Sequence, residues 1–206
     1  RGYGSSTIFL ILGGCLLALA LERWQLHRRI AFLIVTRAGA SARGLVLGVM
    51  AATAFLSMWV SNTSTTLMML PVAVSIAAIV APEQGASDGA RRNFSTVIVL
   101  GIAYAATIGG VATLIGTPTN ALAVAFMEQT YGVRPSFAEW LIFGLPCTLL
   151  LLPLTWWVMV RWTHPFDLPD ISGARDLVRV ELRALGPMSV PEKRVAAVGL
   201  AAAVAW

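Results

Sequence analysis

The sequence predicts an all-α integral membrane protein, and its composition and hydropathy are the observations that predict it. Of the 206 residues, 57% are hydrophobic and only 12% are charged, and the mean hydropathy is +0.77. A soluble domain carries about 25% charged residues, because charge coats its surface. Half that proportion cannot cover a water-facing exterior of this size. The composition therefore excludes a soluble globular enzyme, a disordered chain and a fibrous repeat.

The charge that is present is typical of loops beside membrane spans. The chain has 15 Lys and Arg against 10 Asp and Glu, a net charge of +5. Cationic loops explain this excess, and no basic stripe interleaved with stacking aromatics indicates a nucleic-acid partner. Cys15 and Cys147 lie in apolar runs, where we expect small core residues. His27 and His164 stand far apart in surface segments and predict no zinc site.

The first two segments differ in kind. Residues 7–21 are apolar and predict a spanning helix. Residues 22–43 alternate basic side chains with apolar and aromatic ones. That pattern predicts an amphipathic helical arm that lies at the membrane interface.

Residues 44–82 form a stretch without a charged side chain. The stretch is too long for one helix and barely long enough for two. A polar cluster at 59–66 lies in its middle, where a lipid-facing helix would carry leucine. We therefore expect a hairpin of two apolar helices with the polar residues at its tip.

The following span, residues 94–127, is interrupted. Glycine, threonine, proline and asparagine break its apolar pattern at 109–120. Glycine permits non-helical backbone angles, and Pro118 has no N–H to donate, so this composition predicts a discontinuous helix. Residues 128–136 follow as an exposed loop.

Residues 141–162 predict one more span, interrupted by Pro146 and Pro153 and ended by tryptophans of an aromatic belt. Residues 163–194 carry charges of both signs and predict a cytoplasmic loop.

Both ends of the chain suggest that it is a piece of a longer protein. It begins at Arg1 rather than at Met, and it stops at Trp206, inside an apolar run that begins at Val195. A spanning helix needs about 20 residues. We therefore expect residues 1–194 to form an N-terminal-half transmembrane unit and 195–206 to begin a second half.

The distribution of cations predicts the orientation. If the uncharged stretch enters and leaves the membrane on the cytoplasmic face, thirteen of the fifteen cations lie inside, all but Arg1 and Arg134. The opposite orientation would violate the positive-inside rule. The sequence thus predicts a multi-pass protein of the cytoplasmic (inner) membrane.

The two polar breaks predict a binding site. Non-helical backbone is tolerated in a bilayer only where protein or a water-filled cavity satisfies its polar groups. Freed carbonyls, hydroxyls and amide oxygens suit a hard cation such as Na⁺, and half-helix N-termini suit an anion. Neither break holds Asp, Glu or His, which disfavours a proton relay. We expect the cation and the anion to support each other's binding.

Four motifs make the sequence similar to a known family. Residues 58–71 (MWVSNTSTTLMMLP) and 109–120 (GGVATLIGTPTN) resemble the paired signatures of the divalent anion:sodium symporter (DASS) family. Residues 21–31 are similar to the arm that precedes its hairpin, and 187–194 to the link into its second half. The chain departs from the family at Thr119, where proline is frequent.

The resemblance implies a fold and a set of site residues. The fold would be one half of an inverted repeat, with a re-entrant hairpin and a discontinuous helix, in a homodimer with elevator-type alternating access. By the same resemblance a Na⁺ site would use Ser57, Ser61, Asn62 and the backbone of Gly116. The substrate carboxylate would face Asn62 and Thr63, with Thr117 and Pro118 lining the same pocket.

These observations predict sodium-coupled symport of di- or tricarboxylates such as succinate or malate. Sulfate or another small anion carried by a relative in the wider ion-transporter group is the alternative, and an anion channel is a further one. An intramembrane enzyme would need a nucleophile with a base or a metal constellation. The chain offers Ser and Thr without a base, so we expect no enzyme, and no cofactor beyond Na⁺ as coupling ion.

Overall fold

The computed structural model describes residues 6–37, 41–80, 87–168 and 172–205. Within these ranges the regular structure is helical throughout and no strand occurs, which confirms the all-α prediction. The elements in chain order are α1 (Ser6–Arg23), α2 (Leu26–Arg37), α3 (Ala42–Ser57), α4 (Asn62–Val80), α5 (Asp88–Val111), α6 (Pro118–Tyr131), α7 (Phe137–Val158) with a π-helical end η2 (Met159–Thr163), α8 (Ser172–Ala184) and α9 (Val190–Ala205).

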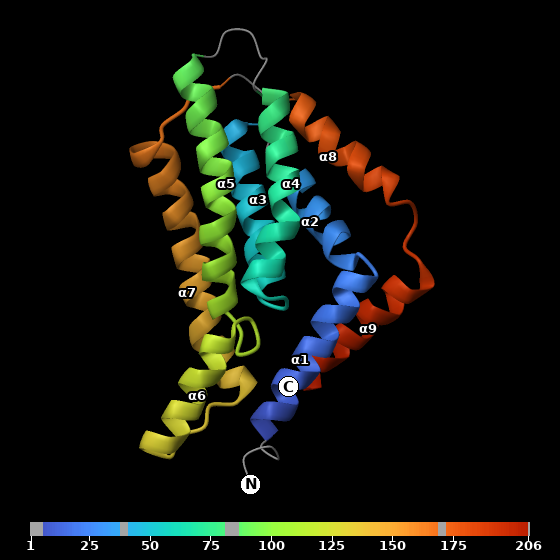
Figure 1. The fold of residues 1–206 in the computed structure, drawn as a ribbon, viewed down its shortest axis with the longest axis vertical. Helices are drawn as coiled ribbons and strands as arrows, with labels where there is room; N and C mark the ends of the chain where they lie inside the picture. The colour runs from blue at the N-terminus through green and yellow to red at the C-terminus, as the bar shows by residue number, and fades with distance from the viewer. Residues whose placement is uncertain (1–5, 38–40, 81–86, 169–171, 206) are drawn as a thin grey trace.

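A bundle of α3, α4, α5 and α7 forms the main body (Figure 1), with α3 packed against the other three. Its core consists of apolar side chains that exclude solvent completely, such as Val46, Val49, Ile98 and Ile102. The α3–α5 contact is close because α5 carries Gly101, at which a β-carbon would lie 3.0 Å from the Met50 side chain. This packing places the α3–α4 hairpin beside the α5–α6 break.

A second group, α1 and α9, lies side by side at the lower end of Figure 1. Two helices join it to the bundle: α2 leads from α1 to α3, and α8 leads back to α9. Each link to this group turns through a residue in the left-handed region, Gln25 with φ 57° and Gly186 with φ 63°. The α1–α9 pair and the bundle thus face each other across the region of the hairpin tip.

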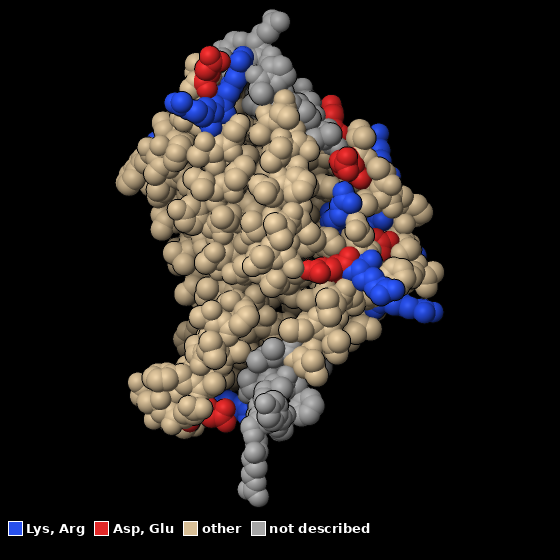
Figure 2. All heavy atoms as spheres, viewed as in Figure 1, with Lys and Arg blue, Asp and Glu red and all other residues tan. Residues whose placement is uncertain are grey.

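The molecule has the surface of a membrane protein. Within the described residues, two helices are long and apolar enough to cross a membrane, Asp88–Val111 and Phe137–Thr163. Much of α7 is exposed and apolar, with Phe143 75% and Leu150 70% exposed. Figure 2 shows a broad face without charge over the bundle, with Lys, Arg, Asp and Glu gathered at its ends and along α8. Lipid is the solvent that suits such a face.

The arm predicted at 22–43 contains α2, but its cations are not uniformly exposed. Arg29 is buried, whereas Arg28 and Arg37 on the same helix are exposed. Residues 38–40 at the end of the arm lie outside the described residues. A pattern that alternates basic and apolar side chains shows that a helix is amphipathic, and it does not show which cation meets a partner from another segment.

The segment predicted as a cytoplasmic loop, residues 163–194, contains helical structure. Most of that range is helical, as α8 and the start of α9. Val178 is buried, and Leu182 and Leu185 pack against the core at spacings of four and three residues. The charged residues Asp176, Arg179 and Arg183 are exposed on α8. Mixed charge is typical of a loop, but the helical period of the apolar residues in the sequence indicates a helix.

The prediction that Pro146 and Pro153 interrupt the last span is wrong, because α7 runs unbroken from Phe137 to Val158. Both prolines are exposed at the protein surface, so their rings displace no packed neighbour. The helix also begins earlier than predicted, at a capping box in which Ser136 and Glu139 satisfy each other's backbone N–H groups.

Candidate functional site

The hairpin tip joins α3 to α4 through residues 58–61. The side chain of Ser61 begins α4, because its hydroxyl accepts a hydrogen bond from the Ser64 N–H at 3.3 Å and so satisfies one of the free donors of the helix start. Val60 is buried at the tip while Trp59 is half-buried. The tip is therefore a capped turn between two helices and presents the first turn of α4 toward α5.

Ser57 lies at the centre of a small group of oxygen atoms. Its Oγ is 2.7 Å from Asn62 Oδ1 and 2.7 Å from the Ala106 carbonyl oxygen. A hydroxyl has one proton and can donate to only one acceptor at a time. The second contact therefore needs either an Asn62 amide turned to donate, or a cation among the three oxygens.

Glycines on α5 and in the break allow the hairpin to approach. A β-carbon on Gly109 would overlap the backbone of Ala54, and one on Gly110 would overlap Asn62 Oδ1. A β-carbon on Gly116 would lie 2.5 Å from the Gly110 carbonyl oxygen and 3.0 Å from that of Ser57. Only hydrogen fits at these three positions, so the backbone of the break touches the hairpin directly.

The break itself, residues 112–117, is held by side-chain hydrogen bonds. Asn120 Nδ2 donates to the carbonyl oxygens of Gly110 at 2.8 Å and Thr113 at 2.7 Å. The Thr113 hydroxyl donates to the carbonyl oxygen of Met58 in the hairpin tip. These bonds satisfy backbone carbonyls that a continuous helix would have paired itself. Helix α6 then starts at Pro118 without a side-chain cap from Thr117.

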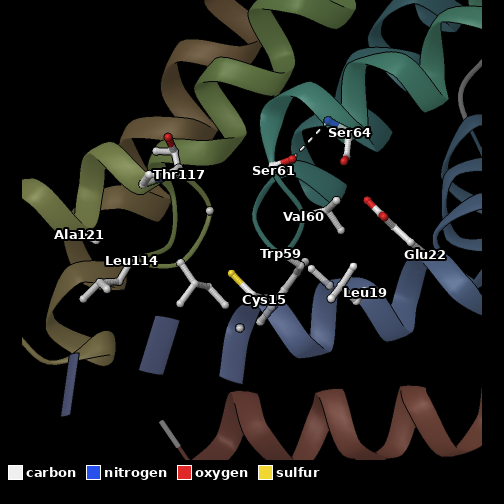
Figure 3. A pocket seen from close by; sticks show the side chains of 15 residues that line it. Cys15, Leu19, Glu22, Trp59, Val60, Ser61, Ser64, Leu114, Thr117 and Ala121 are labelled. Atoms are coloured by element: carbon white, nitrogen blue, oxygen red, sulfur yellow. Dashed lines mark hydrogen bonds between the residues drawn. The ribbon is translucent and has the colours of Figure 1, made fainter. Parts of the chain in front are cut away.

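A cavity of about 310 Å³, which we call the site cavity, lies between α1, the hairpin tip and the break. Figure 3 shows side chains from all three elements pointing into it. The site cavity is lined on the hairpin side by Ser61 and Ser64, and on the break side by Gly116, Thr117 and Pro118. From α1 it receives Cys15 and Glu22. Glu22 is the one acidic or basic side chain among its lining residues.

The predicted site residues fall into two groups. Ser57, Asn62 and Gly116 come together at the hairpin–break contact. Ser61, Gly116, Thr117 and Pro118 line the site cavity. Thr63 is exposed on the first turn of α4 and belongs to neither group.

Asn120 and Thr113 hold the break together, and the sequence interpretation gave them no role. Both residues lie in the polar run at 109–120, inside an otherwise apolar span. A polar residue at such a position indicates a functional or structural role, and this was the signal in the sequence. Their partners lie 7, 10 and 55 residues away, and no local pattern predicts such pairs.

The expectation of buried cysteines is wrong, since Cys15 and Cys147 are both exposed.

Comparison with known proteins identifies relatives along the whole chain. The family described as "Sodium:sulfate symporter transmembrane region" matches residues 1–206. The chain is 40% identical over 206 residues to the sodium-dependent dicarboxylate transporter SdcS of Staphylococcus aureus strain USA300, and equally to that of strain NCTC 8325 / PS 47. Each alignment covers 99% of this chain and 40% of the relative. The chain thus spans about two fifths of the length of the curated relatives it matches.

Proposed function

Because this chain belongs to the family of the sodium:sulfate symporter transmembrane region, we propose that it forms part of a sodium-coupled symporter of di- or tricarboxylates such as succinate or malate. The name of the 40% identical relative, a sodium-dependent dicarboxylate transporter, supports this substrate class. The family and this relative indicate a transporter and not an enzyme. Na⁺ is then the coupling ion, and no organic cofactor takes part.

The observation that carries the proposal is the oxygen group around Ser57. Ser57 Oγ lies 2.7 Å from both Asn62 Oδ1 and the Ala106 carbonyl oxygen, and it has a single hydroxyl proton to donate. A hard cation among these oxygens would resolve this shortage of donors, as would an Asn62 amide turned to donate, and we propose the cation because neutral oxygens are the ligands it prefers. We assign Na⁺ to Ser57, Asn62 and the backbone of Gly116, with Ser61 supplying a further hydroxyl from the tip.

The anion would bind where two helices begin. Helix α4 starts at Asn62 and α6 starts at Pro118, and Thr117 and Pro118 line the site cavity. Helix N-termini carry partial positive charge and free N–H groups, so they hold a carboxylate without a permanent cation. In this assignment Asn62, Thr63, Thr117 and Pro118 face the substrate, and the bound Na⁺ adds attraction.

The resemblance to the divalent anion:sodium symporters implies the finer architecture that we propose. The α3–α4 hairpin is re-entrant from the cytoplasmic face of the inner membrane, and α5–α6 is the discontinuous transmembrane helix of one half of an inverted repeat. The whole protein works as a homodimer by an elevator-type movement. The uncharged hairpin, with the cations of α2 and of the α5 start on its flanks, supports this orientation.

The test is uptake of radiolabelled succinate into vesicles that contain the full-length protein. We expect uptake with an inward Na⁺ gradient and background uptake when choline replaces Na⁺. Asn62→Ala should abolish the Na⁺-dependent rise in melting temperature of the purified protein. Ser75→Ala, at an exposed position of the same helix, should retain it. Equal uptake in both salts would refute symport.

Sulfate is the second candidate substrate, because the matching family carries sulfate in its description. Unlabelled sulfate in excess should leave succinate uptake unchanged if the site is built for a dicarboxylate. If labelled sulfate is taken up with Na⁺ and unlabelled succinate does not compete, the substrate assignment changes to an oxyanion while the coupling to Na⁺ stands.

A further inference from the structure

A second cavity adjoins the site cavity. This arm cavity, of about 550 Å³, lies between α4 and the corner where α1 turns into α2, with His27 and Arg28 on its wall. Glu22 and Ser64 line both cavities. In Figure 3 the Glu22 carboxylate points from α1 toward Ser64 at the start of α4. These two side chains therefore stand where one cavity meets the other.

Glu22 has no ion-pair partner among the residues that the structure describes. Glu22 takes part in none of the ion pairs found in the described part of the chain. Arg28, the cation of the arm cavity, lies 3.8 Å from Glu181 and donates to Gln25 at 3.0 Å. Glu22 is thus an acidic side chain beside a site cavity whose other lining residues are neutral.

His27 does not supply the missing positive charge. Its Nδ1 lies 2.9 Å from the Leu21 carbonyl oxygen, so the ring donates its proton to the end of α1. Burial lowers the pKa of His27 below 6.5 although Glu22 acts in the opposite direction. The His27 ring is therefore neutral at pH 7. It does not offset the effect of the Glu22 side chain on ions near the two cavities.

We propose that Glu22 and Ser64 form the narrow point of an access path from the arm face to the candidate site, and that Glu22 makes this path select for cations. The inference rests on the proposed function and names a residue outside the proposed Na⁺ and substrate ligands. A fixed negative charge in a partly enclosed path raises the local concentration of cations and lowers that of anions. Na⁺ would thus be enriched over the dianion along this path.

The first experiment measures this selectivity without transport. Ser64→Cys is introduced into the full-length protein with every native cysteine replaced, and its rates of reaction with a cationic and an anionic methanethiosulfonate are compared. The quantity compared is the ratio of the rate with the cationic reagent to the rate with the anionic one. We expect this ratio to be about 10-fold higher for the Ser64→Cys protein than for a free thiol in solution. Glu22→Gln should bring the ratio close to the free-thiol value, and Glu22→Asp should keep it high.

The Ser64→Cys protein with Glu22 in place offers a further readout. Raising the salt concentration from 0.01 M to 1 M shortens the screening length from about 30 Å to about 3 Å, so the rate ratio should fall toward that of a free thiol. If the ratio of the two reaction rates changes neither with salt concentration nor with Glu22→Gln, the inference is overturned. This outcome is independent of whether the protein transports succinate.

Kinetics in vesicles complete the test. Glu22→Gln should raise the Na⁺ concentration for half-maximal uptake about 5-fold and leave the KM for succinate at saturating Na⁺ unchanged. Asp88→Asn removes an exposed carboxylate at the start of α5 and should change neither value. An unaltered Na⁺ dependence in Glu22→Gln contradicts the inference alone, while absence of Na⁺-dependent uptake in the unmodified protein contradicts the proposed function.

Discussion

Asn62 Oδ1 occupies the space that a β-carbon on Gly110 would need. The first residue of α4 therefore touches the backbone near the end of α5, and the hairpin and the interrupted helix share one contact surface. Ser57 Oγ reaches Asn62 from the end of α3 and also reaches Ala106 in α5. The geometry of the proposed Na⁺ site thus depends on the absence of a side chain at residue 110.

Gly110→Ala should displace Asn62 and weaken Na⁺ binding. Overpacking of this kind costs about 1–3 kcal/mol, which corresponds to a rise of about 5-fold or more in the Na⁺ concentration for half-maximal uptake. Gly89→Ala in the same helix is the matched control, because its β-carbon would meet only the Ser87 hydroxyl at 3.9 Å. If uptake by both variants depends on Na⁺ in the same way, Asn62 is not part of the cation site.

Asn120→Ala should destabilise the break. The carbonyl oxygens of Gly110 and Thr113 would lose their Asn120 donor in a buried environment, at about 1–3 kcal/mol for each group left unsatisfied. We expect a clear fall in melting temperature of the purified protein. Thr119→Ala, at the exposed neighbouring position, should change it little. If the two variants melt alike, the Asn120 amide does not hold the break.

Arg29 should be the most costly arginine to replace among those of the arm. Its guanidinium bonds Glu192 Oε1 at 3.2 Å and the carbonyl oxygens of Gly186 at 2.9 Å and Leu185 at 3.1 Å. Breaking a buried pair by removing one partner costs about 3–5 kcal/mol. Arg29→Met should therefore lower the melting temperature strongly.

The controls for Arg29 use its neighbours. Arg28→Met removes a half-exposed pair with Glu181, worth about 0–1 kcal/mol, and should have a small effect. Adding Glu192→Gln to Arg29→Met should recover part of the loss, because it removes the uncompensated carboxylate. A double variant as unstable as the sum of both single variants would show that the two side chains act independently.

His27 predicts a loss of stability in mild acid. Burial holds its folded pKa below the ordinary 6.5, so the unfolded chain binds the proton more readily. Stability is unaffected well above pH 6.5 and falls as the pH drops from 6.5 toward the folded pKa, by at most about 1.4 kcal/mol per pH unit. The melting temperature should fall less between pH 8 and pH 5 in His27→Gln than in the unmodified protein. An equal fall in both would refute this role.

The organisation of the chain along its length could be predicted because it depends on local composition. Runs of apolar residues define membrane helices, and glycine and proline at 109–120 interrupt one of them whatever surrounds it. Val178, Leu182 and Leu185 keep a helical period in the sequence, whereas the mixed charge of the same segment is typical of a loop. The exposure of Cys15 could not be predicted, because α1 is apolar on every side.

By itself the sequence determined the class of the protein, an all-α membrane protein with polar residues at a hairpin tip and at a helix break. The tertiary structure alone decided which of those polar groups meet. Ser57 reaches Ala106 across 49 residues, and Arg29 reaches Glu192 across 163. Periodicity and propensity describe neighbours along the chain, whereas these contacts form only when helix packing brings distant backbone and side chains within hydrogen-bond distance.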